Sequence, residues 1–287
     1  MIRFGSLSSQ LPPVLPTVNV RRPYFSCLFA IQFNANFCLP IMRVPTSFAL
    51  AILFTVISVP AMAGPDIDVV YGDDIARRGE VAAEMAVRWS QTAKTGAFAG
   101  RSMWQGVGEL SYGVTDNLNV GFKLPLTRVD GTVYGHGALA EVKYVAPHAS
   151  SGFYWGGEIE AGSIKPIGEE RAFSVEAFPI LGYRTGRFHF VGNPGVEYSS
   201  EGDDKGWEFT PKAKASYSIN DRHAVGVEYH IDAGKFGSFG ARGKRSEVAY
   251  LTWDTKIASR QFSVAFGHGT THASDRWAFR IGIELDD

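Results

Sequence analysis

The chain has 287 residues, of which 45% are hydrophobic and 20% charged, with 28 basic and 29 acidic residues. Mean hydropathy is −0.05, which excludes a bundle of membrane helices because each helix needs about 20 predominantly apolar residues. The near balance of charge argues against a nucleic-acid partner, which requires a basic surface.

The first recognisable segment, residues 42–63, has the pattern of a secretory signal peptide. It begins with a short basic stretch, continues with an apolar run, and ends at residues 61–63, an A-x-A cleavage pattern. A transmembrane helix is the alternative, but the apolar run is shorter than the about 20 residues of a membrane span. We therefore expect translation to start at Met42, residues 1–41 to be an upstream extension, and the mature chain to begin at Gly64.

The expected mature chain contains no cysteine, because Cys27 and Cys38 both precede the cleavage site. Disulfides, cysteine nucleophiles and thiolate metal sites are therefore excluded. Of the 28 basic residues four precede Gly64, and none of the 29 acidic residues does, which leaves a net charge of −5. The histidines show no metal-ligand spacing, so we expect neither a metal nor another cofactor.

Residues 64–79 carry several charges around a few apolar residues, including Asp73, Asp74 and Tyr71. If the following strands close into a barrel, two interpretations stay open. The segment inserts into the lumen as a plug, as a small inserted segment can, or it forms a periplasmic tail.

From residue 80 onward, apolar and polar residues alternate, which is the pattern of strands with one apolar face. The clearest example is 104–126, in which the turn 115–117 joins two runs of the about ten residues that span a membrane as a β-strand. The alternation predicts twelve strands, at residues 80–90, 104–114, 118–127, 136–146, 153–164, 173–184, 187–198, 207–219, 223–231, 246–257, 261–268 and 276–285.

Short turns alternate with longer polar loops along these strands, as in outer-membrane barrels. We therefore predict an all-β fold, a transmembrane antiparallel β-barrel of about 12 strands over residues 80–287, with 10 or 14 strands as alternatives. A soluble β-sandwich is the other alternative, but its strands usually have about 5–6 residues. Aromatic residues near the strand ends also favour membrane-interface girdles, as at Trp104, Tyr112, Trp207, Tyr217, Tyr229, Trp253 and Trp277.

The polar face of such a barrel would line its lumen, because charged side chains are costly in hydrocarbon. One interpretation is a conduit that selects solutes by charge, and the other is a salt-bridged, partly filled interior. The predicted lumen-lining residues are Glu84, Arg88, Glu109, Lys123, Glu141, Lys143, Glu158, Glu160, Glu176, Arg184, His189, Lys212, Lys214, Glu228, Arg280 and Glu284.

Four prolines interrupt the predicted strands: Pro125, Pro179, Pro194 and Pro211. Proline removes a donor from the strand ladder, so we expect bulges or kinks at these positions. Such irregularities are common in barrels, and they could also open the wall toward the membrane.

One pattern resembles an enzyme site. His272 and Ser274 lie two residues apart in a predicted loop, where a histidine could activate the serine hydroxyl. Similar His-x-Ser pairs occur in outer-membrane phospholipase A and lipid A deacylase, but their following asparagine is Asp275 here. We therefore expect no enzyme, with a rim lipid hydrolase as an alternative.

The residues 112–116 (YGVTD), 124–126 (LPL) and 273–277 (ASDRW) resemble a proteobacterial family of outer-membrane β-barrel proteins. Members associated with the phenol meta-cleavage pathway are regarded as transporters. The resemblance spans most of 79–287 and implies a porin-like or facilitator role, with hydrophobic or aromatic compounds among the solutes. Barrels of this kind commonly end on an aromatic residue read by the assembly machinery, whereas Leu285 stands near the end here.

We expect a passive channel or facilitator for small solutes in the outer membrane of a Gram-negative bacterium. Its expected partners are outer-membrane lipid, lipopolysaccharide and the barrel-assembly machinery. The alternatives are a structural or adhesive surface barrel with a closed lumen and the rim lipid hydrolase described above.

Overall fold

The computed structural model describes residues 67, 69–95, 98–201, 205–239, 241–258 and 260–286. The expected extension, signal peptide and cleavage site lie outside these residues. Within the described part of the chain, no helix is long and apolar enough to cross a membrane.

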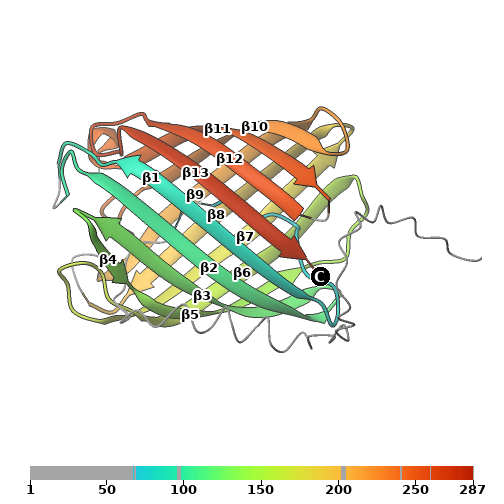
Figure 1. Ribbon diagram of the computed structural model, residues 1–287, viewed down its shortest axis with the longest axis horizontal. Coiled ribbons are helices and arrows are strands. Elements are labelled where there is room, and N and C mark those ends of the chain that lie inside the picture. Colours follow the sequence, from blue (N-terminus) through green and yellow to red (C-terminus); the bar gives the residue numbers. More distant parts are fainter. Residues whose placement is uncertain are drawn as a thin grey trace, which may run out of the picture. The chain divides into compact units, whose positions relative to one another are not determined.

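The described residues form thirteen strands of one antiparallel sheet (Figure 1). The strand β1 pairs with both β2 and β13, and β3 pairs with β2 and β5, so the sheet closes on itself. Twelve strands complete the barrel, and β4 is an additional short strand against β3. The strands are β1 (Val81–Gln91), β2 (Ser102–Thr115), β3 (Leu118–Val129), β4 (Thr132–Gly135), β5 (Gly137–Val145), β6 (Gly152–Ile164), β7 (Ala172–Thr185), β8 (Phe188–Ser199), β9 (Gly206–Ser218), β10 (His223–Asp232), β11 (Ser246–Ile257), β12 (Arg260–Gly269) and β13 (Trp277–Asp286), with a short 3-10 helix η1 (Arg242–Lys244).

The outer face of the barrel is apolar because side chains alternate along each strand. Leu251 is 65% exposed, Phe153 62% and Ile159 55%, although all three are large and hydrophobic. A closed barrel leaves no strand edge unpaired, and its apolar exterior suits contact with lipid acyl chains. The predicted transmembrane barrel is confirmed, and the sandwich alternative is wrong.

The two ends of the barrel differ in their connections. Short links join β2 to β3, β7 to β8 and β11 to β12, and we name this the turn end. Longer segments such as 92–101, 233–245 and 270–276 connect strands at the opposite end, which we name the loop end. Outer-membrane barrels have this asymmetry between periplasmic turns and extracellular loops.

The structure corrects one predicted strand, residues 136–146. The observed β5 begins at Gly137, and the separate strand β4 precedes it. His136 lies between them, and its backbone N–H donates to the Pro125 carbonyl at 2.9 Å. The register shifts by one residue here, with Gly137 at a φ of 119°, so the β3 wall bends at the predicted proline bulge.

Pro179 and Pro194 lie opposite each other where the β7–β8 ladder is interrupted. Pairing is continuous up to Ala177 and resumes at Leu181. Between them, the side chain of Asn193 donates from Nδ2 to the Pro179 carbonyl at 3.2 Å. This interruption leaves an inward-facing asparagine in the middle of the wall, where it contacts the segment described next.

Candidate functional site

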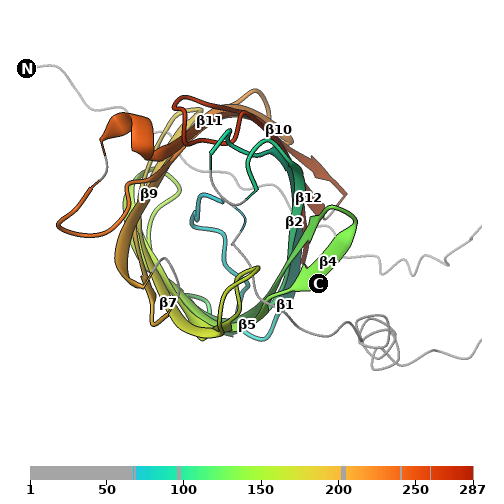
Figure 2. The same cartoon turned by 90° about the vertical axis from the view of Figure 1, so that its left-hand side faces the viewer.

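Residues 67 and 69–74, which precede the first strand, lie inside the barrel (Figure 2, blue), and we name them the luminal segment. Its main anchor is Tyr71, which is only 8% exposed. The Tyr71 backbone N–H donates to Asn193 Oδ1 at 2.9 Å, and Asn193 Nδ2 donates to the Tyr71 carbonyl at 3.0 Å. The Tyr71 hydroxyl donates to Glu160 Oε1 at 3.0 Å, and its ring lies 4.8 Å from that of Phe178. The backbone of Tyr71, through Asn193, and its side chain, through Glu160 and Phe178, thus hold the segment in the middle of the barrel.

Two aspartates hold the same luminal segment toward the turn end. Asp73 accepts two hydrogen bonds from the Arg184 guanidinium, at 2.5 and 3.0 Å. Its carboxylate also lies 3.5 Å from His148 Nε2. Asp74 lies 3.2 Å from Lys143 Nζ. Bidentate arginine–carboxylate pairs are among the stronger polar contacts in proteins, so the segment is an ordered part of the lumen.

A layer of buried side chains crosses the middle of the barrel around Lys123. The Lys123 ammonium lies among four carboxylates, at 3.5 Å from Glu109, 3.3 Å from Glu141, 2.8 Å from Glu158 and 2.6 Å from Glu160. It also lies 4.7 Å from the centre of the Tyr71 ring, a cation–π contact. We name Tyr71, Lys123, Glu141, Glu160, Phe178 and Lys212 the middle layer.

Three carboxylates of this region could together reach one metal ion. Oxygens of Glu141, Glu158 and Glu160 all lie within 4.8 Å of one another. However, Lys123 Nζ is within 3.3 Å of each of the three side chains. The ammonium thus supplies the positive charge that a metal would bring, and a metal would have to displace it.

The middle layer lies between two cavities. A cavity of about 600 Å³ opens at the turn end and is lined by the luminal segment together with charged side chains of both signs. A second cavity of about 320 Å³ lies at the loop end, and we name it the vestibule. The alternation along β7 shows the order: Ser174 and Glu176 line the vestibule, Phe178 belongs to the middle layer, and Arg184 lines the turn-end cavity.

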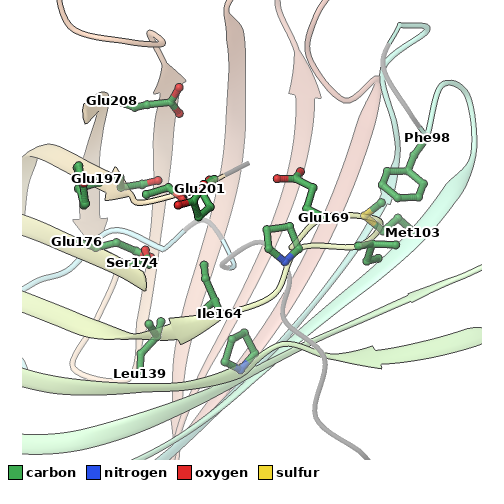
Figure 3. A pocket seen from close by; sticks show the side chains of 15 residues that line it. Phe98, Met103, Leu139, Ile164, Glu169, Ser174, Glu176, Glu197, Glu201 and Glu208 are labelled. Carbon is green, nitrogen blue, oxygen red and sulfur yellow. Dashed lines mark hydrogen bonds between the residues drawn. The ribbon is translucent and has the colours of Figure 1, made fainter. Parts of the chain in front are cut away.

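The vestibule is lined by both acidic and apolar side chains (Figure 3). Among the described residues that line it none is basic, and five are glutamates: Glu169, Glu176, Glu197, Glu201 and Glu208. The apolar lining residues are Phe98, Met103, Pro125, Leu139, Ile164, Pro166 and Ile167. Such a cavity presents a carboxylate surface and a hydrophobic surface to the same molecule.

The strand register places five glutamates directly opposite one another on five successive strands. Glu141 on β5 is paired with Glu160 on β6, and Glu160 with Glu176 on β7. Glu176 is paired with Glu197 on β8, and Glu197 with Glu208 on β9. We name this row the glutamate ladder. It runs from the middle layer into the vestibule.

The predicted lumen residues divide among these regions. The turn-end cavity is lined by Glu84, Glu109, Lys123, Lys143, Glu158, Arg184, His189, Lys214, Glu228, Arg280 and Glu284. Glu176 lines the vestibule, while Glu141, Glu160 and Lys212 are buried in the middle layer. Arg88 is buried nearer the loop end, where it pairs with Asp275 at 2.7 Å.

Sequence reasoning did not identify the residues that organise the lumen. The alternation of polar and apolar residues did not single out Tyr71 or Asn193 as lumen residues. Asp275 was considered only for its position next to Ser274 in the sequence. The one available signal was the cluster of aspartates before the first strand, which suggested insertion without naming partners for Asp73 or Asp74.

His272 and Ser274 are not arranged as a base and a nucleophile in this structure. Ser274 is 3% exposed and its hydroxyl donates to the Glu247 carbonyl at 2.8 Å, while it accepts from the Glu247 N–H at 2.7 Å. His272 is exposed, and in the described residues no hydrogen bond joins it to Ser274. Ser274 thus fastens the last loop to β11.

Solved structures share this fold. An outer membrane channel from Pseudomonas putida F1 matches with a TM-score of 0.57 at 11% identity, over 77% of this chain and 100% of the other. The KdgM porin in complex with disordered oligogalacturonate matches with a TM-score of 0.50 at 9% identity, over 71% and 98%. At these identities the likeness shows the fold alone. No family model and no curated protein matches the sequence.

Proposed function

We propose that the protein is a passive outer-membrane channel or facilitator for small solutes. The observation that carries this proposal is the pair of cavities that enter the barrel from opposite ends with one layer of side chains between them. A lumen with a charged lining supports selection by size and charge. The apolar exterior and the barrel fold support a location in the outer membrane after export, with the turn end toward the periplasm.

In this mechanism the middle layer is the constriction. A solute enters the vestibule, passes the layer around Tyr71 and Lys123, and leaves through the turn-end cavity. The luminal segment forms part of the constriction, because Tyr71 fills the space between Phe178 and Lys123. No covalent step is needed, since the driving force is the solute gradient.

The apolar lining residues of the vestibule support solutes with a hydrophobic or aromatic body. Ligand sites of this size bind largely through apolar surface, with a few polar groups that fix orientation. The resemblance of residues 112–116 to barrels associated with phenol degradation favours the same class. We include an aromatic solute in the proposal.

Single-channel conductance in a planar bilayer tests the proposal. The full chain would be exported by a Gram-negative host and purified in detergent, and its folding checked by heat-modifiable gel migration. We expect small discrete conductance steps that grow when Tyr71→Ala removes the ring from the middle layer. Lipid-facing Tyr183→Ala, which leaves the lumen intact, is the matched control. A folded protein that stays silent with and without Tyr71→Ala would contradict the proposal.

The ion pairs around Lys123 favour a second candidate, a structural or adhesive barrel with a permanently closed lumen. A silent but correctly folded barrel would support it. The rim hydrolase is a third candidate. Lipid hydrolysis by the wild-type protein that is lost in Ser274→Ala would support that role.

A further inference from the structure

We infer that the segment 233–245, which we name the basic loop, binds the phosphorylated head of lipopolysaccharide beside the barrel wall. The binding site does not depend on the proposed channel function. It depends only on the loop end of the barrel facing the outside of the cell, as the longer connections of outer-membrane barrels do.

The first observation is the place of the basic loop outside the barrel. The Ala233 N–H donates to the Phe209 carbonyl at 2.9 Å, and the Phe236 N–H donates to the Trp207 carbonyl at 3.0 Å. These hydrogen bonds hold the start of the loop against the first residues of β9. Figure 2 shows η1 and the described part of the loop (orange) outside the barrel wall beside β9. The loop can therefore meet the surrounding membrane.

The second observation is a cluster of three phenylalanines on the outer surface. Side chains alternate along β9, and Glu208 lines the vestibule, so Phe209 faces outward. The ring centres of Phe236 and Phe239 lie 5.9 and 6.1 Å from that of Phe209, and 5.8 Å from each other. Phe236 is 53% exposed and Phe239 46% exposed. Apolar surface of this kind gains free energy when acyl chains cover it.

Trp207 marks the level of this cluster relative to the membrane. Its side chain is 49% exposed, and its ring centre lies 5.1 Å from that of Tyr198. Tryptophan and tyrosine at strand ends are typical of the interface between acyl chains and head groups. Because the Phe236 backbone is hydrogen-bonded to that of Trp207, the phenylalanines lie at this interface. The following residues of the basic loop are then at the level of the lipid head groups.

The third observation is the charge of the loop. Residues 233–245 contain no acidic residue and four basic ones: Lys235, Arg242, Lys244 and Arg245. Among the other connections at the loop end, 92–101 has two basic residues, 165–171 and 270–276 have equal numbers of basic and acidic residues, and 200–205 is acidic. Lysine and arginine bind phosphate through charge-assisted hydrogen bonds. The basic loop is therefore the connection that best matches an anionic head group.

The short helix η1 carries two of these four charges. Arg242 and Lys244 are its first and last residues, and Lys244 is exposed. Lys235 and Arg245 also interact with other groups of the protein. The two basic residues of η1 are therefore the ones to substitute in a test of phosphate binding.

The combination of charge and apolar surface selects one class of amphiphile. A soluble polyanion would meet the basic residues but leave the phenylalanines in water. A neutral lipid would cover the phenylalanines but would not be attracted by the basic residues. Lipopolysaccharide carries phosphates beside its acyl chains and forms the outer leaflet, so it matches both features at the loop end.

Lipid binding to the full chain tests the inference by native mass spectrometry. The protein would be exported by a Gram-negative host, purified in detergent and washed free of copurified lipid. The probes are diphosphoryl lipid A, monophosphoryl lipid A and phosphatidylglycerol. We expect diphosphoryl lipid A to bind most tightly and phosphatidylglycerol least tightly. Equal binding of these two lipids would overturn the assignment to lipopolysaccharide.

Arg242→Gln with Lys244→Gln removes two positive charges from η1. Each basic residue near an anionic lipid surface contributes roughly a factor of five to binding, so we expect the Kd for diphosphoryl lipid A to rise about 25-fold. The matched control is Lys94→Gln with Arg101→Gln, which removes the same charge from another connection at the loop end and should leave the Kd unchanged. A Kd that rises equally in both double variants, or in neither, would refute the site.

Phe236→Ser with Phe239→Ser tests the apolar part of the site. Both side chains are exposed, so the barrel should still fold, which heat-modifiable gel migration would check. We expect the Kd for diphosphoryl lipid A to rise about tenfold. The preference for diphosphoryl over monophosphoryl lipid A should stay the same, because the basic residues remain. A wild-type Kd in this variant would contradict a site that combines acyl-chain and phosphate contacts.

Discussion

The two ends of the lumen are built from the same alternating strands, yet they arrange charge in different ways. At the turn end, several carboxylates lie against cations: Asp73 with Arg184, Asp74 with Lys143, and Glu228 with Arg280 and Lys214. One row of directly opposite glutamates, Glu284, Glu84 and Glu109, lies beside them. At the loop end, inward positions of β7, β8 and β9 place glutamates directly opposite one another. The middle layer lies between the two arrangements.

This difference shows that charged side chains in one lumen can be arranged in two ways, as pairs of opposite charge or as rows of like charge. Paired charges at the turn end hold the luminal segment and fix its geometry, although buried pairs contribute little net stability. At the loop end, neighbouring strands place glutamates directly opposite one another, an arrangement that disfavours the sheet. We therefore expect charge removal to destabilise the barrel at the turn end and in the middle layer but not at the loop end, and four substitutions test that contrast.

The largest expected effect comes from Lys123→Met, which removes the ammonium from among four carboxylates. Loss of one partner of a buried ion pair lowers the free energy of unfolding by about 3–5 kcal/mol, because the remaining charges stay buried without compensation. Urea unfolding of the detergent-solubilised protein would measure it. Adding Glu160→Gln should restore part of the loss, and a double variant no more stable than Lys123→Met would contradict the charge argument.

Glu228→Gln should have the next largest effect. The Glu228 carboxylate lies 2.7 Å from Arg280, 3.1 Å from His230 and 3.3 Å from Lys214. Glutamine keeps the volume but removes the charge, and hydrogen bonds to charged groups contribute about 1.5–3 kcal/mol. We expect the free energy of unfolding to fall by about that amount in the same urea experiment. An unchanged unfolding midpoint would show that the turn end does not depend on paired charge.

A smaller effect is expected for Asp73→Asn, which weakens the link between the luminal segment and Arg184. Partly exposed ion pairs contribute up to about 1 kcal/mol, so trypsin should cleave after Arg77 or Arg78 about fivefold faster. Mass spectrometry of the released segment would measure the rate. Asp221→Asn, which lines the same cavity, is the control. Equal rates in the two variants would mean that Asp73 does not hold the segment.

The barrel could be predicted from the sequence because its main signal is local. Alternation along 104–126 or 207–219 predicts which residues face lipid, and this prediction does not depend on which strands are neighbours. The extra strand β4 was missed because four residues carry too little alternation, and because Gly137 breaks the pattern between β4 and β5. The position of the bulge opposite Pro125 followed from proline chemistry.

The site was predicted only as a set of inward-facing residues. In the ladder, Glu141, Glu160 and Glu176 are direct partners on neighbouring strands. Their pairing depends on connections of different lengths, so no fixed sequence spacing predicts it. The contact between Tyr71 and Asn193 could not be predicted either. Asn193 can bind the Tyr71 backbone only because the pairing of β7 with β8 is interrupted at Pro179 and Pro194. Long-range register, which periodicity does not specify, decides both features.

The smallest expected effect has the opposite sign. Glu197 lies directly between Glu176 and Glu208 in the ladder, and its Oε1 accepts a hydrogen bond from Thr210 at 2.8 Å. Glutamine can accept the same hydrogen bond while removing repulsion from both neighbours, so Glu197→Gln should raise the free energy of unfolding by about 0.2–1 kcal/mol. Replicate urea transitions with Glu228→Gln alongside would resolve a difference of sign. Destabilisation by both variants would mean that the loop end, too, depends on its negative charge for folding, and the contrast between the two ends would then fail.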